Sequence, residues 1–262
     1  MLFRSIVAYN WQLMFAITGL VGLIWLVPWL MMVKDDAPLA DVTVTSARPR
    51  SSGISLGGIL SSPMIWGTLI VAFCYNYFTF YCMTWMPAYL VEQRGLSLER
   101  SGLYTFFSFA GIACVALGSG WVADRLIQRG GNAVYIRKAF TVAGFLGACT
   151  IVLGAHANSV SVALFWNVFS LSFIGLTTAN NLALCRLTLV PAPVVGLVTG
   201  VQQVATSLAG IVAPIVSGWL LQVSGSYAAP MQVIFVFLLI GALATVFLLR
   251  PEWAPKLREP VI

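Results

Sequence analysis

Charged side chains are scarce in this chain. Of its 262 residues, 14 are Lys or Arg and 8 are Asp or Glu, whereas 60% of all residues are hydrophobic. A soluble domain carries about 25% charged residues, so this chain has too few polar groups to cover a surface that faces water. The composition therefore excludes an ordinary soluble globule and predicts a protein whose exterior faces lipid.

A basic patch is also missing, although the net charge is +6. A nucleic-acid-binding protein gathers its Lys and Arg residues on one face, often with aromatic residues between them. Here the basic residues lie at the ends of long apolar runs, as they do in membrane proteins. We therefore expect the lipid bilayer, and no nucleic acid, as a partner.

The residues that carry most enzyme chemistry are absent or badly spaced. The chain has one histidine, His156, which we expect to cap a helix in solvent, and no nucleophile–base pair, metal-ligand spacing or phosphate-binding loop. Its five cysteines form no CxxC pair and all lie in apolar runs, which predicts buried small apolar side chains rather than a disulfide framework or zinc site. The sequence predicts no enzyme, cofactor or metal site.

Long apolar runs dominate the remainder of the sequence. A helix needs about 20 mostly apolar residues to cross a bilayer. On this criterion the chain is an all-α integral membrane protein with seven transmembrane helices, at 11–33, 64–91, 102–123, 139–156, 160–184, 195–222 and 230–249.

The first span stands apart from the other six. A loop at 34–62, rich in Ser, Thr, Arg and Gly, separates residues 1–33 from a six-helix block at 63–250, and a tail at 251–262 follows. Ser62 and Pro63 form a typical helix start, with Ser as the cap and Pro in the first turn.

The distribution of basic residues predicts the topology. With the amino terminus outside, only Arg4, Arg94 and Arg100 face outward. The inner segments then hold Lys34, Arg48, Arg50, Arg125, Arg129, Arg137, Lys138, Arg186, Arg250, Lys256 and Arg258. Cytoplasmic loops are normally enriched in Lys and Arg, so we predict an outer amino terminus and a cytoplasmic carboxyl terminus.

A short repeat divides the six-helix block into two. "SGWVADR" (119–125) ends the second span of the first three, and "SGWLLQV" (217–223) ends the second span of the last three. The first copy leaves the membrane on the inside and the second on the outside. Two three-helix repeats of opposite orientation build each half of major-facilitator transporters, and the two copies, with three identical residues and one similar residue, are consistent with that arrangement.

Three motifs resemble this superfamily. Gly120-Trp-Val-Ala-Asp124-Arg125 is similar to its G-x-x-x-D-R loop motif, and "FCYNYFTFYCMTWMPAYLVEQRGLS" (73–97) and "GVQQVATSLAGIVAPIVSGWL" (200–220) resemble the seventh and eleventh helices of its anion:cation symporter family. The resemblance covers residues 11–250 and implies helices six to twelve. Helices one to five have no counterpart, so the chain resembles a carboxyl-terminal half whose amino-terminal half is missing.

The resemblance implies that Gly120, Asp124 and Arg125 form a conformational latch on the cytoplasmic side. Gly118 and Gly120 leave room for a neighbouring helix. We expect Asp124 to lie near the start of the span at 195–222, whose free N–H groups and positive dipole end attract a carboxylate. The alternative is that these charges only set the topology.

Three spans carry polar residues on one helical face. These are Asn76 and Thr79 in the second span, Asn167, Ser170, Thr177 and Asn181 in the fifth, with Asn180 beside them, and Thr199, Gln203 and Thr206 in the sixth, with Gln202 adjacent. Such groups cost several kcal/mol when unpaired in hydrocarbon, so they face other helices or a wet cavity. The pattern alone leaves both possibilities open, but the resemblance favours a solute site, because the family's seventh, tenth and eleventh helices contribute to it. The candidate substrate-binding residues are Tyr75, Asn76, Tyr81, Asn180, Asn181, Gln202 and Gln203.

Carboxylates are absent from the interior of all seven spans. Proton coupling usually needs an ionisable group in the pathway, which then has to belong to the missing half. The resemblance implies transport of a small organic anion, of the sugar-acid or carboxylate type, with H⁺ or Na⁺ as coupling ion and a bacterial inner membrane as location. The alternatives are an inserted but inactive fragment and a seven-span receptor.

Overall fold

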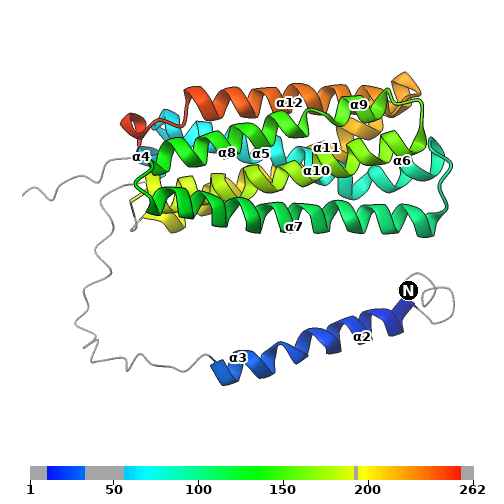
Figure 1. The fold of residues 1–262 in the computed structure, drawn as a ribbon, viewed down its shortest axis with the longest axis horizontal. Helices are drawn as coiled ribbons and strands as arrows, with labels where there is room; N and C mark the ends of the chain where they lie inside the picture. Colours follow the sequence, from blue (N-terminus) through cyan, green and yellow to red (C-terminus); the bar gives the residue numbers. More distant parts are fainter. Residues whose placement is uncertain (1–10, 33–55, 192–193, 255–262) are drawn as a thin grey trace, which may run out of the picture. The chain divides into compact units, whose positions relative to one another are not determined.

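A computed structural model describes residues 11–32, 56–191 and 194–254, in two units divided between Arg50 and Ser51 (Figure 1). The first unit contains α2 (Trp11–Ile24) and α3 (Leu26–Met32). Together these helices provide an apolar segment at Phe15–Met32 that is long enough to cross a membrane and has no buried residue within the unit. The predicted loop at 34–62 lies largely outside the described residues, as does most of the tail.

The second unit is a bundle of six membrane-length helices (Figure 1). It comprises α4 (Leu56–Leu60), α5 (Pro63–Thr84), α6 (Met86–Glu92), α7 (Leu98–Gln128), α8 (Ala133–Ala148), α9 (Ile151–Ala155), α10 (Val160–Ala183), a π-helix (Leu184–Leu189), α11 (Val195–Ser224), α12 (Ala228–Phe247) and a 3₁₀ turn (Pro251–Trp253). With Phe15–Met32, seven spans are confirmed. The described part of the chain contains no strand.

Span boundaries differ from the prediction where polar residues extend a helix beyond the apolar run. α7 begins four residues earlier than predicted, because Ser97 caps its start by accepting a hydrogen bond from Arg100 N. It also ends five residues later than predicted, because the helix continues through the polar stretch that holds Asp124 and Arg125. α8 begins six residues early, at a cap in which Asn132 accepts hydrogen bonds from Val134 N and Tyr135 N. Hydropathy indicates which part of a helix lies in lipid, whereas capping residues indicate where the helix begins.

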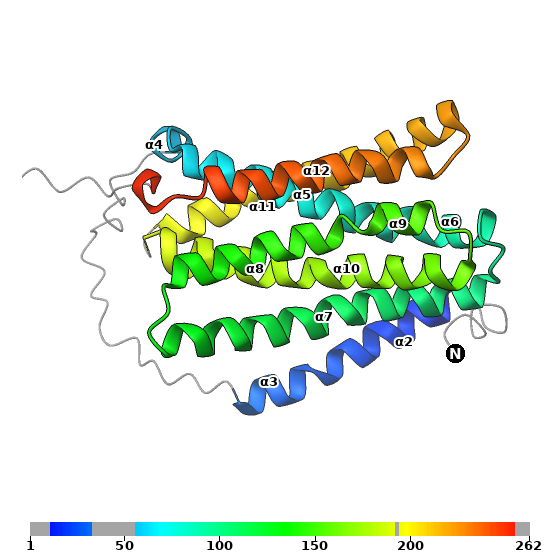
Figure 2. The ribbon, with the colours of Figure 1, turned by 45° about the horizontal axis from the view of Figure 1, so that its top comes forward.

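The two three-helix repeats exchange their first helices (Figure 2). α10, the first helix of the second repeat, packs against α7 and α8 of the first. α5, the first helix of the first repeat, packs in the same way against α11 and α12 of the second. Each pairing therefore has a counterpart when α5, α7 and α8 are replaced by α10, α11 and α12, as an inverted repeat requires.

Glycine lets α10 approach both of its neighbours closely. A Cβ atom added at Gly175 would lie 2.4 Å from the Ile112 carbonyl oxygen and 2.8 Å from the Ala116 nitrogen, both in α7. One added at Gly144 of α8 would lie 2.7 Å from the Thr177 nitrogen of α10. In a membrane, helices associate through such close van der Waals packing, because lipid is as apolar as the side chains.

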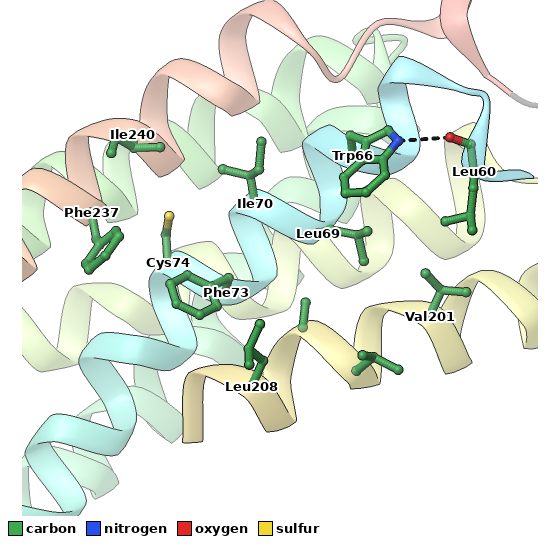
Figure 3. Close-up of a pocket in the computed structure, with 12 residues that line it drawn as sticks. Leu60, Trp66, Leu69, Ile70, Phe73, Cys74, Val201, Leu208, Phe237 and Ile240 are labelled. Carbon is green, nitrogen blue, oxygen red and sulfur yellow. Dashed lines mark hydrogen bonds between the residues drawn. The ribbon is translucent and has the colours of Figure 1, made fainter. Parts of the chain in front are cut away.

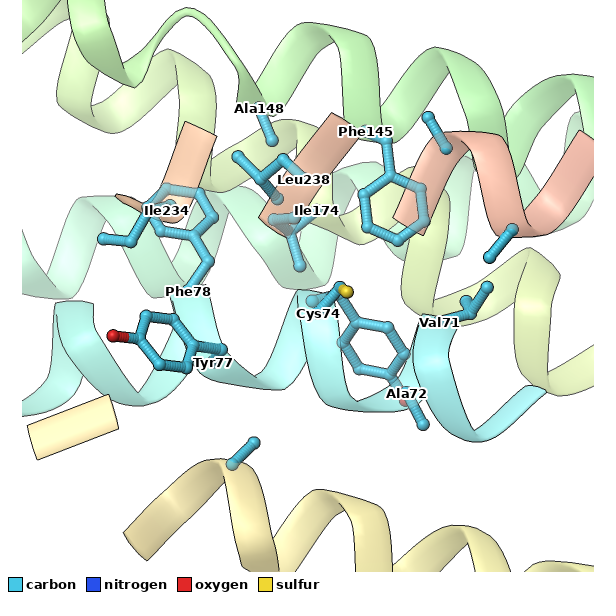
Figure 4. Packing of buried hydrophobic residues seen from close by; sticks show 14 of the residues in the cluster. Val71, Ala72, Cys74, Tyr77, Phe78, Phe145, Ala148, Ile174, Ile234 and Leu238 are labelled. Atoms are coloured by element: carbon cyan, nitrogen blue, oxygen red, sulfur yellow. The ribbon is translucent and has the colours of Figure 1, made fainter. Parts of the chain in front are cut away.

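The bundle core lies where α5, α8, α10 and α12 meet (Figure 4). Phe145 of α8 is fully buried there, beside Cys74 of α5 and against Gly241 of α12. Ile174 of α10 and Leu238 of α12 complete this layer. Three of the five cysteines are buried, as predicted, but Cys114 is exposed and Cys149 half-buried; none is in a disulfide.

Two ends of the bundle are distinguished by their connections. The end near α4, which we call the α4 end, carries the turn between α7 and α8, where Gly130 adopts a positive φ of 93°. The opposite end, which we call the α6 end, carries the turns at 93–97, 156–159 and 225–227. The topology predicted from basic residues places the α4 end in the cytoplasm.

Arg94 connects α6 to the carboxyl end of α9 at the α6 end of the bundle. Its guanidinium donates to the carbonyl oxygens of Ala157 (2.8 Å) and Gly154 (2.9 Å), which close α9, and its Nε donates to the Tyr89 hydroxyl. A cation at a helix carboxyl end is stabilising. Nearby, the Tyr227 hydroxyl donates to Glu92 at 2.7 Å, and burial together with that carboxylate raises the pKa of Tyr227 to about 12. Tyr227 thus stays a donor at neutral pH.

Candidate functional site

Part of the predicted polar set meets between the middle of the bundle and its α4 end. Asn76 of α5 donates to the Thr206 hydroxyl of α11 at 3.1 Å. Tyr75 and Gln202 both lie near Cys185 of the π-helix, and the Cys185 thiol donates to Asn181 Oδ1 at 3.7 Å. We call these residues the central polar cluster: Tyr75, Asn76, Asn181, Cys185, Gln202 and Thr206. It brings together side chains from α5, α10 with its π-helix, and α11.

The central polar cluster holds amide atoms that no described residue satisfies. Gln202 is 6% exposed; its side chain lies beside the Cys185 thiol, but neither of its amide atoms makes a hydrogen bond of normal geometry in the described structure. Asn181 is 1% exposed, and its Nδ2 has no partner there either. A buried amide without a partner costs roughly 1–3 kcal/mol, and such groups usually mark a functional requirement or an unseen partner.

Other predicted residues lie elsewhere. Asn180 is fully buried and donates to Ser119 of α7 at 3.3 Å, so it joins two helices, as the alternative interpretation of these amides expects. Tyr81 is fully buried nearer the α6 end, beside Tyr77 and Tyr89. Gln203 is exposed, because one step along α11 rotates it by about 100° from Gln202.

The backbone departs from regular α-helix at the central polar cluster and again further along α5 and α11. The π-helix Leu184–Leu189 follows α10 directly and positions Cys185. Short π-helical segments of this kind occur frequently at functional sites. Pro214 lies inside α11, and the indole of Trp85, at the break between α5 and α6, donates to the Pro214 carbonyl oxygen at 3.1 Å.

The predicted latch residue Asp124 has a partner that sequence reasoning did not assign to it. Its carboxylate accepts from Arg137 of α8 at 2.7 Å, and within the described residues this is its only hydrogen bond. The expected contact with the start of α11 is not formed, because α7 packs against α10 and α8, whereas α11 packs against α5 and α12. Arg125 instead lies over the ring of Trp121.

The glycines of the latch motif face open space in the described structure. A Cβ atom added at Gly118 or Gly120 would meet no described atom within 4 Å, so no described helix makes the expected close approach. The same holds for Gly196 and Gly200 of α11. α7 and α11 are also the least buried spans of the bundle, with 17% of their apolar windows buried.

A wide groove between α5, α11 and α12 is unsuited to a polar solute (Figure 3). Its volume is about 670 Å³, and its lining is apolar, including Phe73, Leu208 and Ile240. The one indole nitrogen that lines it, Nε1 of Trp66, is already bonded to the Leu60 carbonyl oxygen at 2.9 Å. No group of three potential metal ligands occurs among the described residues.

Comparison with known proteins decides the family. The family model described as Major Facilitator Superfamily matches residues 2–189. The chain belongs to the Major Facilitator Superfamily. It is therefore a multi-pass membrane protein of a superfamily of transporters rather than of receptors or enzymes.

Relatives in this superfamily match most of the chain. It is 30% identical to the chloroplastic ascorbate transporter of Arabidopsis thaliana, with 91% of this chain and 46% of the relative covered. It is 28% identical to the hexuronate transporter of Bacillus subtilis (91% and 56%) and to a probable sulfoacetate transporter of Cupriavidus necator (93% and 59%). The chain spans about half the length of the curated relatives it matches.

Within this major-facilitator bundle, Arg186 is a charged residue close to the central polar cluster. The sequence predicts an interfacial charge there, at the inner end of the span at 160–184, with a direct role in anion binding as the alternative. In the structure it lies in the π-helix, exposed, and close enough to Tyr75 and Cys185 to act on them electrostatically. A helix with 3.6 residues per turn would place Arg186 differently, so the sequence pattern gave no signal for this position.

The Asp124–Arg137 pair predicts a measurable effect on stability. Asp124→Asn leaves the Arg137 side chain, 9% exposed, without its counter-charge. Because the Asp124 side chain is 57% exposed, we expect a loss of about 1–2 kcal/mol, less than for a fully buried pair. The thermal midpoint of the purified chain should fall, whereas Arg129→Gln, a control in the adjacent turn, should leave it unchanged.

A double variant separates this structural role from the latch. Asp124→Asn combined with Arg137→Gln removes both charges and should recover most of the lost stability. If transport is recovered as well, Asp124 serves only to hold Arg137. If transport stays low while stability returns, the latch is supported.

Proposed function

We propose that the chain is the carboxyl-terminal half of a facilitator-type symporter that transports a small organic anion of the sugar-acid or carboxylate type by alternating access. In this proposal residues 1–33 are the last helix of the amino-terminal half, 34–62 the loop between halves, 63–250 the transporting bundle and 251–262 a cytoplasmic tail. The observation that supports it is that both amide atoms of buried Gln202 lack a hydrogen-bond partner among the described residues, and that Gln202 and Arg186 each lie near Cys185.

The central polar cluster supplies neutral hydrogen bonds to the solute. Ascorbate, hexuronate and sulfoacetate, which name three of the relatives, are small organic anions with several oxygen acceptors. Gln202 Nε2 and Asn181 Nδ2 are donors suited to such oxygens, and the Arg186 cation attracts the negative charge. The group that binds H⁺ or Na⁺ belongs to the missing half, since these spans contain no interior carboxylate.

The missing half packs on α7 and α11 in this proposal. Both spans are largely unburied, and both carry glycines that face open space toward the α4 end: Gly118 and Gly120 in α7, Gly196 and Gly200 in α11. Small residues of this kind permit close helix contact. Rocking of the two halves about this surface would open the cluster to each side of the bacterial inner membrane in turn.

Uptake assays on Gln202→Leu test the proposal. The chain is produced in bacteria together with an amino-terminal half taken from a relative, and uptake of labelled hexuronate is measured. Losing one hydrogen bond to a charged solute, worth about 1.4 kcal/mol, should lower uptake roughly tenfold. Stability should not fall, because leucine removes an unsatisfied buried amide.

Gln222→Leu is the matched control, an exposed residue at the other end of the same helix. Equal uptake by both variants would contradict the assignment of Gln202. Uptake by the chain without any partner half would contradict the proposal that half of the pathway is missing. An inserted but inactive fragment is indicated if no partner half ever restores uptake.

A further inference from the structure

We propose that the bundle holds a phospholipid at its α6 end, with an acyl chain between α7 and α10 and the phosphate beside Arg94 and Arg100. The proposal rests on two adjoining hollows of opposite character. One is a mainly apolar groove that runs along α7 and α10. The other is a polar, basic hollow at the α6 end, and the two share Tyr104, Ser161 and Leu164 in their walls.

The apolar groove is lined by a ladder of phenylalanines. Phe165, Phe169 and Phe173 follow one another at four-residue intervals along α10, with ring centroids 5.7 Å and 4.4 Å apart. Phe107 and Val115 of α7 form the opposite wall of this hollow of about 650 Å³. Figure 2 shows this stretch of α10 between α7 and α8. The groove thus lies along a membrane-spanning segment, where lipid chains are the surrounding solvent.

The length of the groove matches one lipid leaflet. From Tyr104 to Val115 is eleven residues of helix, about 16 Å at 1.5 Å per residue. Half of a bilayer's hydrocarbon core is about 15 Å thick. An acyl chain that enters at Tyr104 would therefore end near the middle of the membrane.

The basic hollow has the charge that a lipid phosphate requires. Arg94 and Arg100 line it together with Ser97 and Ser161, in a volume of about 680 Å³. Neither arginine has a carboxylate partner within the described residues. Arg94 is held in place by carbonyl oxygens of the α9 end and leaves its positive charge uncompensated. The nearby Glu99 is exposed and does not line the hollow.

The combination favours a lipid over a soluble anion or an apolar ligand. A free phosphate would bind only in the basic hollow, so it would not account for the adjoining apolar groove. An apolar molecule would need no arginines. The other groove, between α5, α11 and α12, is lined without any charged residue. That second groove serves as an internal control, because ordinary bilayer lipid should enter it without headgroup selection.

Photo-crosslinking in membranes that contain the full chain tests the proposal. The probe is phosphatidylglycerol with a diazirine in its acyl chain, and labelled peptides are quantified after irradiation. We expect labelling of the peptides that contain 104–115 and 161–173. Arg100→Gln should reduce it about fivefold, the effect of one basic residue at an anionic headgroup, and leave labelling of the α11–α12 groove unchanged.

Matched variants complete the test. Val168→Trp fills the groove and should reduce its labelling by phosphatidylglycerol, whereas Val236→Trp, at an exposed position of α12 outside both grooves, should not. Arg129→Gln is the charge control. With a phosphatidylcholine probe, labelling should be weaker and insensitive to Arg100→Gln.

Three results would overturn the proposal. Equal labelling of the wild type and Arg100→Gln by phosphatidylglycerol would show that the arginines do not select the headgroup. Displacement of the probe by millimolar glycerol phosphate would indicate a site for soluble anions. Loss of labelling when the amino-terminal half is supplied would show that the groove is a contact between halves.

Discussion

Gly175→Leu is expected to leave almost no folded chain. The added side chain would begin 2.4 Å from the Ile112 carbonyl oxygen and 2.8 Å from the Ala116 nitrogen. Both are backbone atoms of α7, so no side-chain rotation relieves the overlap and α10 has to move as a whole. Overpacking costs about 1–3 kcal/mol even where side chains can adjust, and here we expect at least that.

Yield and thermal midpoint after detergent extraction measure this effect. We expect roughly tenfold less monodisperse protein for Gly175→Leu, corresponding to about 1.4 kcal/mol or more. Gly118→Leu is the control: the same substitution in α7, at a glycine with no described atom within 4 Å of an added Cβ. If both variants are equally stable, the packing of α7 on α10 described above is wrong.

Gly200→Leu is expected to behave in the opposite way, with an intact fold and lost transport. Its added Cβ would meet no described atom within 4 Å, so the chain itself has no reason to unfold. In the proposed transporter this face of α11 lies against the missing half, where close helix contact needs small residues. We expect uptake in the presence of an amino-terminal half to fall about tenfold or more, which corresponds to about 1.4 kcal/mol of lost association.

A graded series makes this prediction specific. Gly200→Ala should lose less uptake than Gly200→Leu, and Val223→Leu, exposed at the other end of α11, should lose none. The thermal midpoint should fall in none of the three, because alanine and leucine favour a helix more than glycine does. Normal uptake by Gly200→Leu would mean that the missing half does not pack on this face of α11.

Sequence alone predicted the parts of the fold that depend on local composition. The seven spans follow from apolar runs of sufficient length, and the start of α5 at Pro63 follows from its turn chemistry. Ser62 occupies the cap position, but its hydroxyl donates to the Trp253 carbonyl oxygen and accepts no capping hydrogen bond from α5. The position was thus predictable, whereas the bonding partner, distant along the chain, was not.

The candidate site was predictable only in part, for the same reason. Helical spacing placed Gln203 on a polar face with Gln202 adjacent to it, but only the packing of α11 on α5 shows that Gln202 is buried in the bundle and Gln203 exposed. The pairing of Asp124 with Arg137 depends on how the turn at 129–132 brings α8 beside α7. The π-helix breaks the regular period and so removes the basis for placing Arg186.

The exchange of first helices between repeats affects the order in which helices can pack during synthesis and membrane insertion. Among the described elements, α5 packs mainly against α11 and α12, which are synthesised more than one hundred residues later. α5 therefore leaves the ribosome and enters the bilayer before its two main packing partners exist. A truncation that stops before α11 is expected to leave α5 in lipid without these two helices, as a substrate for membrane proteases.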